Sequence, residues 1–158
     1  MRLHECAQLI AHHLRRGPGR IQTVAARLQD AGLLSKTEGS RRYPGDISRD
    51  EVVSLFIASI TETSLGGAAA TTSTFAALAD GEGTRFDQAI TDLLFGPDVP
   101  ASDVAVHIAP LAATIAIGGQ VVVFGADEPA SGAVSARFVD ALTIGALRAD
   151  LNKKEHHE

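Results

Sequence analysis

The spacing of apolar residues changes from a helical to a strand pattern partway along this chain. Up to about residue 95, apolar side chains recur every three or four positions, as on one face of a helix. From Val104 the period becomes two, because Val104, Val106 and Ile108 alternate with Ala105 and His107. Helical and strand patterns that occupy separate parts of one chain predict an α+β fold.

Two short helices are expected at the start. The sequence GPG at 17–19 ends the first near Arg16, and the second begins near Arg20. Gly32 stands where a helix closes in a left-handed turn. Their inner faces carry Leu3, Ala7, Ile10 and Leu14 in the first helix and Ile21, Val24, Ala25 and Leu28 in the second. Two helices joined by so few residues have helix-turn-helix geometry.

The outer face of the second helix, residues 20–31, suits the major groove of DNA. Arg20 and Arg27 flank Gln22, Thr23 and Ala26 on this face. Arginine forms bidentate hydrogen bonds with guanine, and glutamine forms them with adenine. Threonine contacts phosphate or a thymine methyl group. The small Ala26 leaves room for the backbone to come close. We therefore expect this helix to read base edges.

A basic polar loop follows the second helix. Residues 35–40, which include Lys36, are polar with a glycine in the middle, and Arg41, Arg42 and Tyr43 follow them. Such a loop is typical of a wing, a small hairpin laid over the DNA backbone. Its cations contact phosphates, which adds affinity but little sequence information.

A third helix is expected after Pro44 and Gly45. Ser48 and Glu51 have the spacing of a capping box. The apolar positions of this helix are Val52, Val53, Leu55, Phe56 and Ile60.

The stretch TVAARLQDAGLLSKTEGSRRYPGDISRDEVVSLFIASI resembles the winged helix-turn-helix of MerR-type regulators and phage excisionase-like proteins. The matching features are a Gly-Leu-Leu step at 32–34, an Arg-Arg-Tyr wing end at 41–43 and an acidic helix start at 50–52. The resemblance implies that Thr23 and Arg27 face DNA, and that the wing end grips phosphate.

The charge is divided unevenly. Residues 1–51 hold nine Lys or Arg and six Asp or Glu, a balance of +3. Residues 52–158 hold five and thirteen, a balance of −8, so the two parts sum to the net charge of −5. A basic end on an acidic body is typical of a protein that meets a polyanion at one end only.

Residues 63–83 mark an expected boundary, because they are small, polar and glycine-containing at both ends. They predict a linker or short helix between a winged helix-turn-helix domain at 1–62 and an α+β dimerisation or partner-binding domain at 84–158. An amphipathic helix is expected at 84–97, with Phe86, Ile90, Leu93 and Leu94 facing inward.

The second domain is expected to contain a small antiparallel sheet. Residues 113–125 predict two strands around Gly118-Gly119, residues 133–139 predict a third, and a final helix capped by Thr143 follows. A sheet of about three strands has exposed edges, which pairing of two copies would cover. A homodimer also matches a palindromic DNA site.

The sequence lacks the marks of an enzyme or a metalloprotein. It has no phosphate loop, dinucleotide fingerprint or nucleophile elbow, so no catalytic residue and no cofactor is expected. Adjacent His12 and His13 point apart on a helix, and Cys6 with His4 lacks further ligands at zinc spacing. One cysteine, no leader pattern and no long apolar run predict a cytoplasmic protein away from membranes.

Three functions are compatible with these patterns. The first is a dimeric, sequence-specific transcriptional regulator of prophage or plasmid type, for example a repressor, that binds double-stranded DNA. The second is a phage accessory or inhibitor protein whose acidic C-terminal domain binds a host protein. The third is a DNA packaging adaptor similar to a small terminase subunit.

Overall fold

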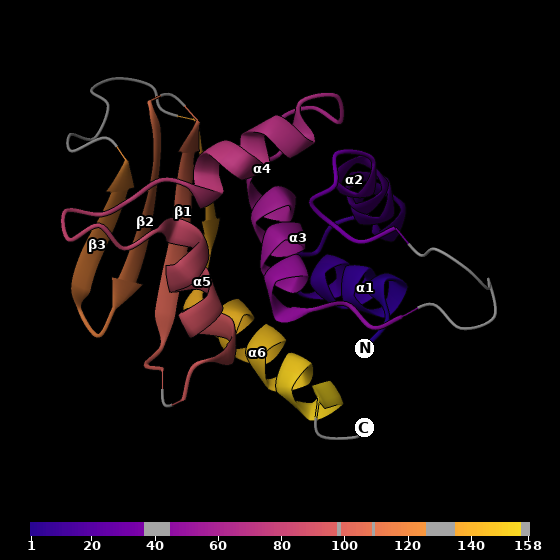
Figure 1. The fold of residues 1–158 in the computed structure, drawn as a ribbon. Coiled ribbons are helices and arrows are strands. Elements are labelled where there is room, and N and C mark those ends of the chain that lie inside the picture. The colour runs from indigo at the N-terminus through magenta and orange to yellow at the C-terminus, as the bar shows by residue number, and fades with distance from the viewer. Residues whose placement is uncertain (37–44, 98, 109, 126–134, 156–158) are drawn as a thin grey trace.

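A computed structural model describes residues 1–36, 45–97, 99–108, 110–125 and 135–155 of the chain (Figure 1). Over these residues it contains six helices and a four-stranded antiparallel sheet, which confirms the α+β class. The helices are α1 (Leu3–His13), α2 (Pro18–Asp30), α3 (Arg49–Thr61), α4 (Ala68–Ala76), α5 (Phe86–Phe95) and α6 (Ala141–Glu155). The strands are β1 (Ser102–Ile108), β2 (Leu111–Ile117), β3 (Gln120–Gly125) and β4 (Ala136–Val139).

The sheet has the order β3-β2-β1-β4. The Gly118-Gly119 hairpin is confirmed, and both glycines have positive φ, 56° and 87°, as a tight turn between right-twisted strands requires. The expected number of about three strands was wrong, because β1 forms a strand of its own beside the hairpin. The last strand pairs with β1 at the edge away from β3, so β3 and β4 are the two edge strands of the sheet.

The start of α6 also differs from the prediction. The helix begins at Ala141, and Asp140 caps it in place of Thr143, because the Asp140 carboxylate accepts the Thr143 backbone N–H at 2.8 Å. A second carboxylate, that of Asp103 on β1, accepts the Ala141 N–H at 2.7 Å. Two carboxylates thus satisfy donors of the first turn, which is the usual role of an N-cap acid.

Helix α3 lies at the centre of the molecule. Nine of its thirteen residues are buried, and it packs against α1, α2, α4, α5 and β1. In Figure 1 it stands between the α1–α2 pair and the α4–α5–sheet part of the fold. A helix that is apolar on all sides has to be enclosed in this way. The predicted capping box of Ser48 and Glu51 is confirmed at its start.

One hydrophobic cluster of the described residues runs from α1 to α6. It includes Phe75 of α4, which lies within the expected boundary segment 63–83. Phe86 of α5 and Phe124 of β3 meet edge to face in the same cluster, with ring centroids 5.3 Å apart. The segment 63–83 is therefore partly helical, which agrees with the expectation of a short helix there. The division into separable parts, 1–62 and 84–158, stays a prediction.

The turn between α1 and α2 differs in detail from the expected one. Helix α1 ends at His13 and α2 begins at Pro18, both earlier than predicted. Arg15 explains the first difference, because its φ of 51° leaves the helical region. Pro18 explains the second, because the first helical position needs no N–H and proline is preorganised for it.

Candidate nucleic-acid interface and a neighbouring arginine pocket

Helix α2 is amphipathic as predicted. Its four predicted inner residues are buried, while Gln22, Thr23 and Arg27 are exposed. The helix lies at the outer side of the α1–α2–α3 group in Figure 1. The side chains expected to meet DNA therefore do reach solvent along one helix.

The exposed face of α2 has two different flanks. Gln22, Ala26 and Gln29 border a shallow hollow of about 250 Å³ shared with His4 and Ala7 of α1. At 100° per residue, the two arginines 20 and 27 lie on the opposite flank. Thr23 lies between the flanks.

Thr23 is less free than the sequence suggests. Its hydroxyl donates to the Gly19 carbonyl at 2.8 Å, one turn back along α2. Its oxygen keeps lone pairs that accept hydrogen bonds, so the group presents an acceptor to a partner.

The expected wing lies mostly outside the described residues. Arg41, Arg42 and Tyr43 belong to 37–44, so the wing stays a prediction. Lys36 is described, and its ammonium lies 3.8 Å from the Asp30 carboxylate in an exposed pair. Both borders of the loop are held by one side chain, because Glu51 accepts the backbone N–H groups of Ser35 and Ser48.

Arg20 is placed differently from the other predicted contacts. It donates to both carboxylate oxygens of Glu62, from Nε at 3.2 Å and from a terminal nitrogen at 2.8 Å. Arg16 donates to the same carboxylate and to the Ser59 carbonyl. Glu62 is 1% exposed and follows α3 directly. The pair therefore fastens the start of α2 to the end of α3.

Glu62 is a residue that sequence reasoning missed. Burial raises the pKa of its carboxyl, but the hydrogen bonds from Arg20 and Arg16 outweigh burial and hold the pKa below its usual value. The available signal was a single acid that closes a strongly apolar helix. Its partners lie more than forty residues earlier, so no local pattern connects them.

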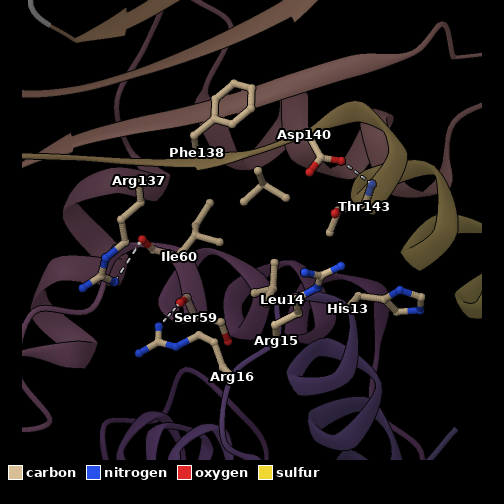
Figure 2. A pocket seen from close by; sticks show the side chains of 11 residues that line it. His13, Leu14, Arg15, Arg16, Ser59, Ile60, Arg137, Phe138, Asp140 and Thr143 are labelled. Carbon is tan, nitrogen blue, oxygen red and sulfur yellow. Dashed lines mark hydrogen bonds between the residues drawn. The ribbon is translucent and has the colours of Figure 1, made fainter.

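A hollow of about 620 Å³ opens beside this ion pair, and we call it the arginine pocket (Figure 2). It lies where the α1–α2 turn, the end of α3, strand β4 and the start of α6 meet. Figure 2 shows Arg16 and Arg137 at one end, and Arg15 nearer to Thr143 and His13. The residues that line it are His13, Leu14, Arg15, Arg16, Ser59, Ile60, Arg137, Phe138, Val139, Asp140 and Thr143.

Arg137 on β4 belongs to a crowded group of cations. Its guanidinium donates to the Ile60 carbonyl at 3.2 Å. Burial lowers the pKa of Arg137, the neighbouring charges of Arg16 and Arg20 lower it further, and Glu62 opposes them. The composition alone did not reveal this group, because the sequence places Arg137 far from the basic N-terminal part.

Other candidate residues of the described chain have structural environments. Cys6 is fully buried, and burial raises the pKa of its thiol to about 12, which leaves it unreactive at neutral pH. His13 Nε2 lies 3.0 Å from the Asp150 carboxylate and so ties α1 to α6. Among the described residues, no group of three or more His, Cys, Asp or Glu side chains is arranged to hold a metal. None of the described helices combines the length and apolar character needed to cross a membrane.

Comparisons with known proteins add no relative. No family model matches the chain, and neither a curated protein nor a solved structure matches it. Function is therefore inferred from surfaces of the described residues: the polar exposed face of α2, the arginine pocket at its start, and the exposed apolar side chains of the C-terminal part.

Proposed function

We propose that the protein binds double-stranded DNA and reads base edges with α2. The observation that carries the proposal is the exposed face of this helix. Gln22, Thr23 and Arg27 are exposed there, while the opposite face is buried in the core. Side chains of these types form the common hydrogen bonds to base edges in the major groove.

The dimensions of α2 suit the groove. Its thirteen residues span about 20 Å at about 1.5 Å per residue. Gly19 and Ala26 are small exposed residues on the same face, so the helix backbone approaches the bases without obstruction. The bidentate pair of Arg20 with Glu62 holds the start of α2, and a recognition helix on a rigid support loses little entropy on binding.

Phosphate contacts are assigned to the basic loop after α2. Lys36, Arg41 and Arg42 are the cations proposed for this role, with Tyr43 as a hydrogen-bonding neighbour. Each lost phosphate contact flattens the slope of log affinity against log salt by about one unit. Arg41→Ala with Arg42→Ala is therefore expected to weaken binding to all sequences about equally.

A homodimer is proposed to form through the sheet. The register places Phe138, Ala105, Thr114 and Val123 in one row across the four strands. Phe138 is 65% exposed and Val123 is 39% exposed, so the row is apolar at both edge strands. An antiparallel sheet facing water usually carries polar residues there. A second copy with the same row satisfies two-fold symmetry and matches a palindromic site.

The decisive experiment selects bound sites from random DNA with the wild-type protein and with Gln22→Ala, Thr23→Ala and Arg27→Ala. Gln22→Ala is expected to change the preferred base at one or two positions, since a bidentate contact contributes about 1–3 kcal/mol of discrimination. Gln88→Ala is the matched control, because Gln88 is an exposed glutamine on α5. If the wild-type protein and all the variants select the same motif, α2 does not contact the bases.

A protein-binding accessory function is the second candidate. The observation that favours it is the set of large apolar side chains that the C-terminal part exposes, namely Phe138, Val121 and Leu142. Salt-dependent DNA binding distinguishes the regulator from this alternative. A ring-shaped oligomer in solution would instead indicate a DNA packaging adaptor.

A further inference from the structure

We propose that the arginine pocket binds a phosphate group. This inference does not depend on base reading by α2. The phosphate belongs either to a free small molecule or to a DNA backbone that passes the start of α2, and the experiment below distinguishes these sources.

The pocket has many hydrogen-bond donors that its own residues leave unused. A guanidinium carries five N–H groups. The Ile60 carbonyl takes one donor of Arg137, and the Ser59 carbonyl and Glu62 take two of Arg16. Within the described chain, the Arg15 guanidinium has no hydrogen-bond or ion-pair partner. A ligand rich in acceptor oxygens is therefore the complementary one.

The charge of the pocket is unbalanced as well. Four cations, Arg15, Arg16, Arg20 and Arg137, lie in or beside it, against the two carboxylates of Glu62 and Asp140. His13 is engaged with Asp150. The remaining excess of two positive charges matches a phosphate, which carries between one and two negative charges at neutral pH.

The backbone at Arg15 gives an independent observation. Helices α1 and α2 both end in the same hydrogen-bonded turn, and each has its left-handed residue at the position after the C-cap. Helix α2 has Gly32 there, with φ of 76°, whereas α1 has Arg15, with φ of 51°. An arginine in this conformation costs energy that glycine avoids. Its side chain extends along the pocket towards Thr143 in Figure 2.

The pocket walls strengthen an ionic contact. Ile60 and Val139 are buried, Leu14 is half-buried, and all three line the pocket. Apolar walls lower the local dielectric constant, so a guanidinium–phosphate bond formed there is stronger than one formed in open water. The pocket thus combines planar donors, excess positive charge and partial shielding from solvent.

Calorimetric titration of the full chain with sodium phosphate, at an ionic strength held constant with sodium chloride, tests the proposal. Saturable binding of one phosphate per chain is expected. Arg137→Gln and Arg15→Gly should each weaken it about tenfold or more, the loss expected for a hydrogen bond between charged groups. Arg15→Gly keeps the fold, because glycine suits the left-handed backbone. Arg85→Gln is the control, because Arg85 is exposed, pairs with Asp87 and lies outside the pocket.

Absence of saturable phosphate binding, or binding that neither pocket variant weakens, would overturn the proposal. Repeating the titration with a saturating short DNA duplex identifies the source. Loss of the phosphate signal with the duplex shows that a DNA phosphate occupies the pocket, and its persistence shows that a free phosphate does. If the protein does not bind DNA, the titration with sodium phosphate alone still shows whether the pocket binds phosphate. Failure of the DNA-binding proposal and failure of the phosphate-binding proposal are therefore distinguishable.

Discussion

Helices α2 and α3 have the same length and opposite surroundings. Each has thirteen residues, but four are buried in α2 and nine in α3. Helix α3 is packed into the core, whereas most residues of α2 remain accessible to solvent. The comparison teaches that two neighbouring helices of equal length differ in how much surface they bury, and that the Arg20–Glu62 ion pair joins the exposed helix to the buried one.

The largest effect that separates the two helices is expected from truncation inside α3. Phe56 is fully buried, so Phe56→Ala should lower the free energy of unfolding by about 3–5 kcal/mol. Gln22→Ala on the exposed face of α2 is the control and should change it by less than about 0.5 kcal/mol. Urea unfolding followed by circular dichroism measures both, and equal costs would contradict the division.

The joint between the helices is the next test. Glu62→Gln removes a charged acceptor of Arg16 and Arg20 and should destabilise the fold by about 1–3 kcal/mol. Asp87→Asn is a matched control, because Asp87 pairs with Arg85 at a much more exposed position. Exposed pairs contribute about 0–1 kcal/mol. Denaturant unfolding measures both variants. A larger loss of unfolding free energy in Asp87→Asn than in Glu62→Gln would mean that the Glu62 ion pair does not stabilise the fold more than an exposed pair.

The same joint predicts a pH dependence. The pKa of Glu62 lies below its ordinary value of 4.5, so the folded state binds this proton less readily than the unfolded chain. The contribution of the Glu62 carboxylate to the free energy of unfolding is therefore fully present above about pH 4.5, and it is lost as the pH falls through the pKa of the folded state. The difference in unfolding free energy between wild type and Glu62→Gln should shrink on acidification. A constant difference would contradict the ion pair.

The smallest effect compares the ends of α1 and α2. Arg15→Gly should stabilise the fold by up to about 1 kcal/mol, because it removes a left-handed non-glycine residue at some cost in unfolded-state entropy. Gly32→Ala makes the reverse change at the end of α2 and should destabilise by about 1 kcal/mol. Thermal unfolding of both variants checks the opposite signs. The same sign for both would show that the two turns are not equivalent.

Local patterns in the sequence determined much of the fold. The periodicity of Ile21, Val24 and Leu28 located the buried face of α2, because a regular helix repeats every 3.6 residues whatever packs against it. The Ser48–Glu51 box and the Gly118-Gly119 turn were equally local, since each is closed by residues at most three apart. The exposed residues of α2 were identified by the same periodicity.

Only the tertiary structure decided how these parts meet. It placed β4 beside β1, brought Asp103 to the start of α6, and brought Glu62 to Arg16 and Arg20. It also carried Arg137 from the C-terminal part to arginines of the N-terminal turn. Some of these residues are more than a hundred positions apart in the sequence. They become neighbours only when the core forms, because burial and charge then determine which side chains can lie together. Sequence periodicity therefore determined which residues face inward, and packing determined which charged side chains became neighbours.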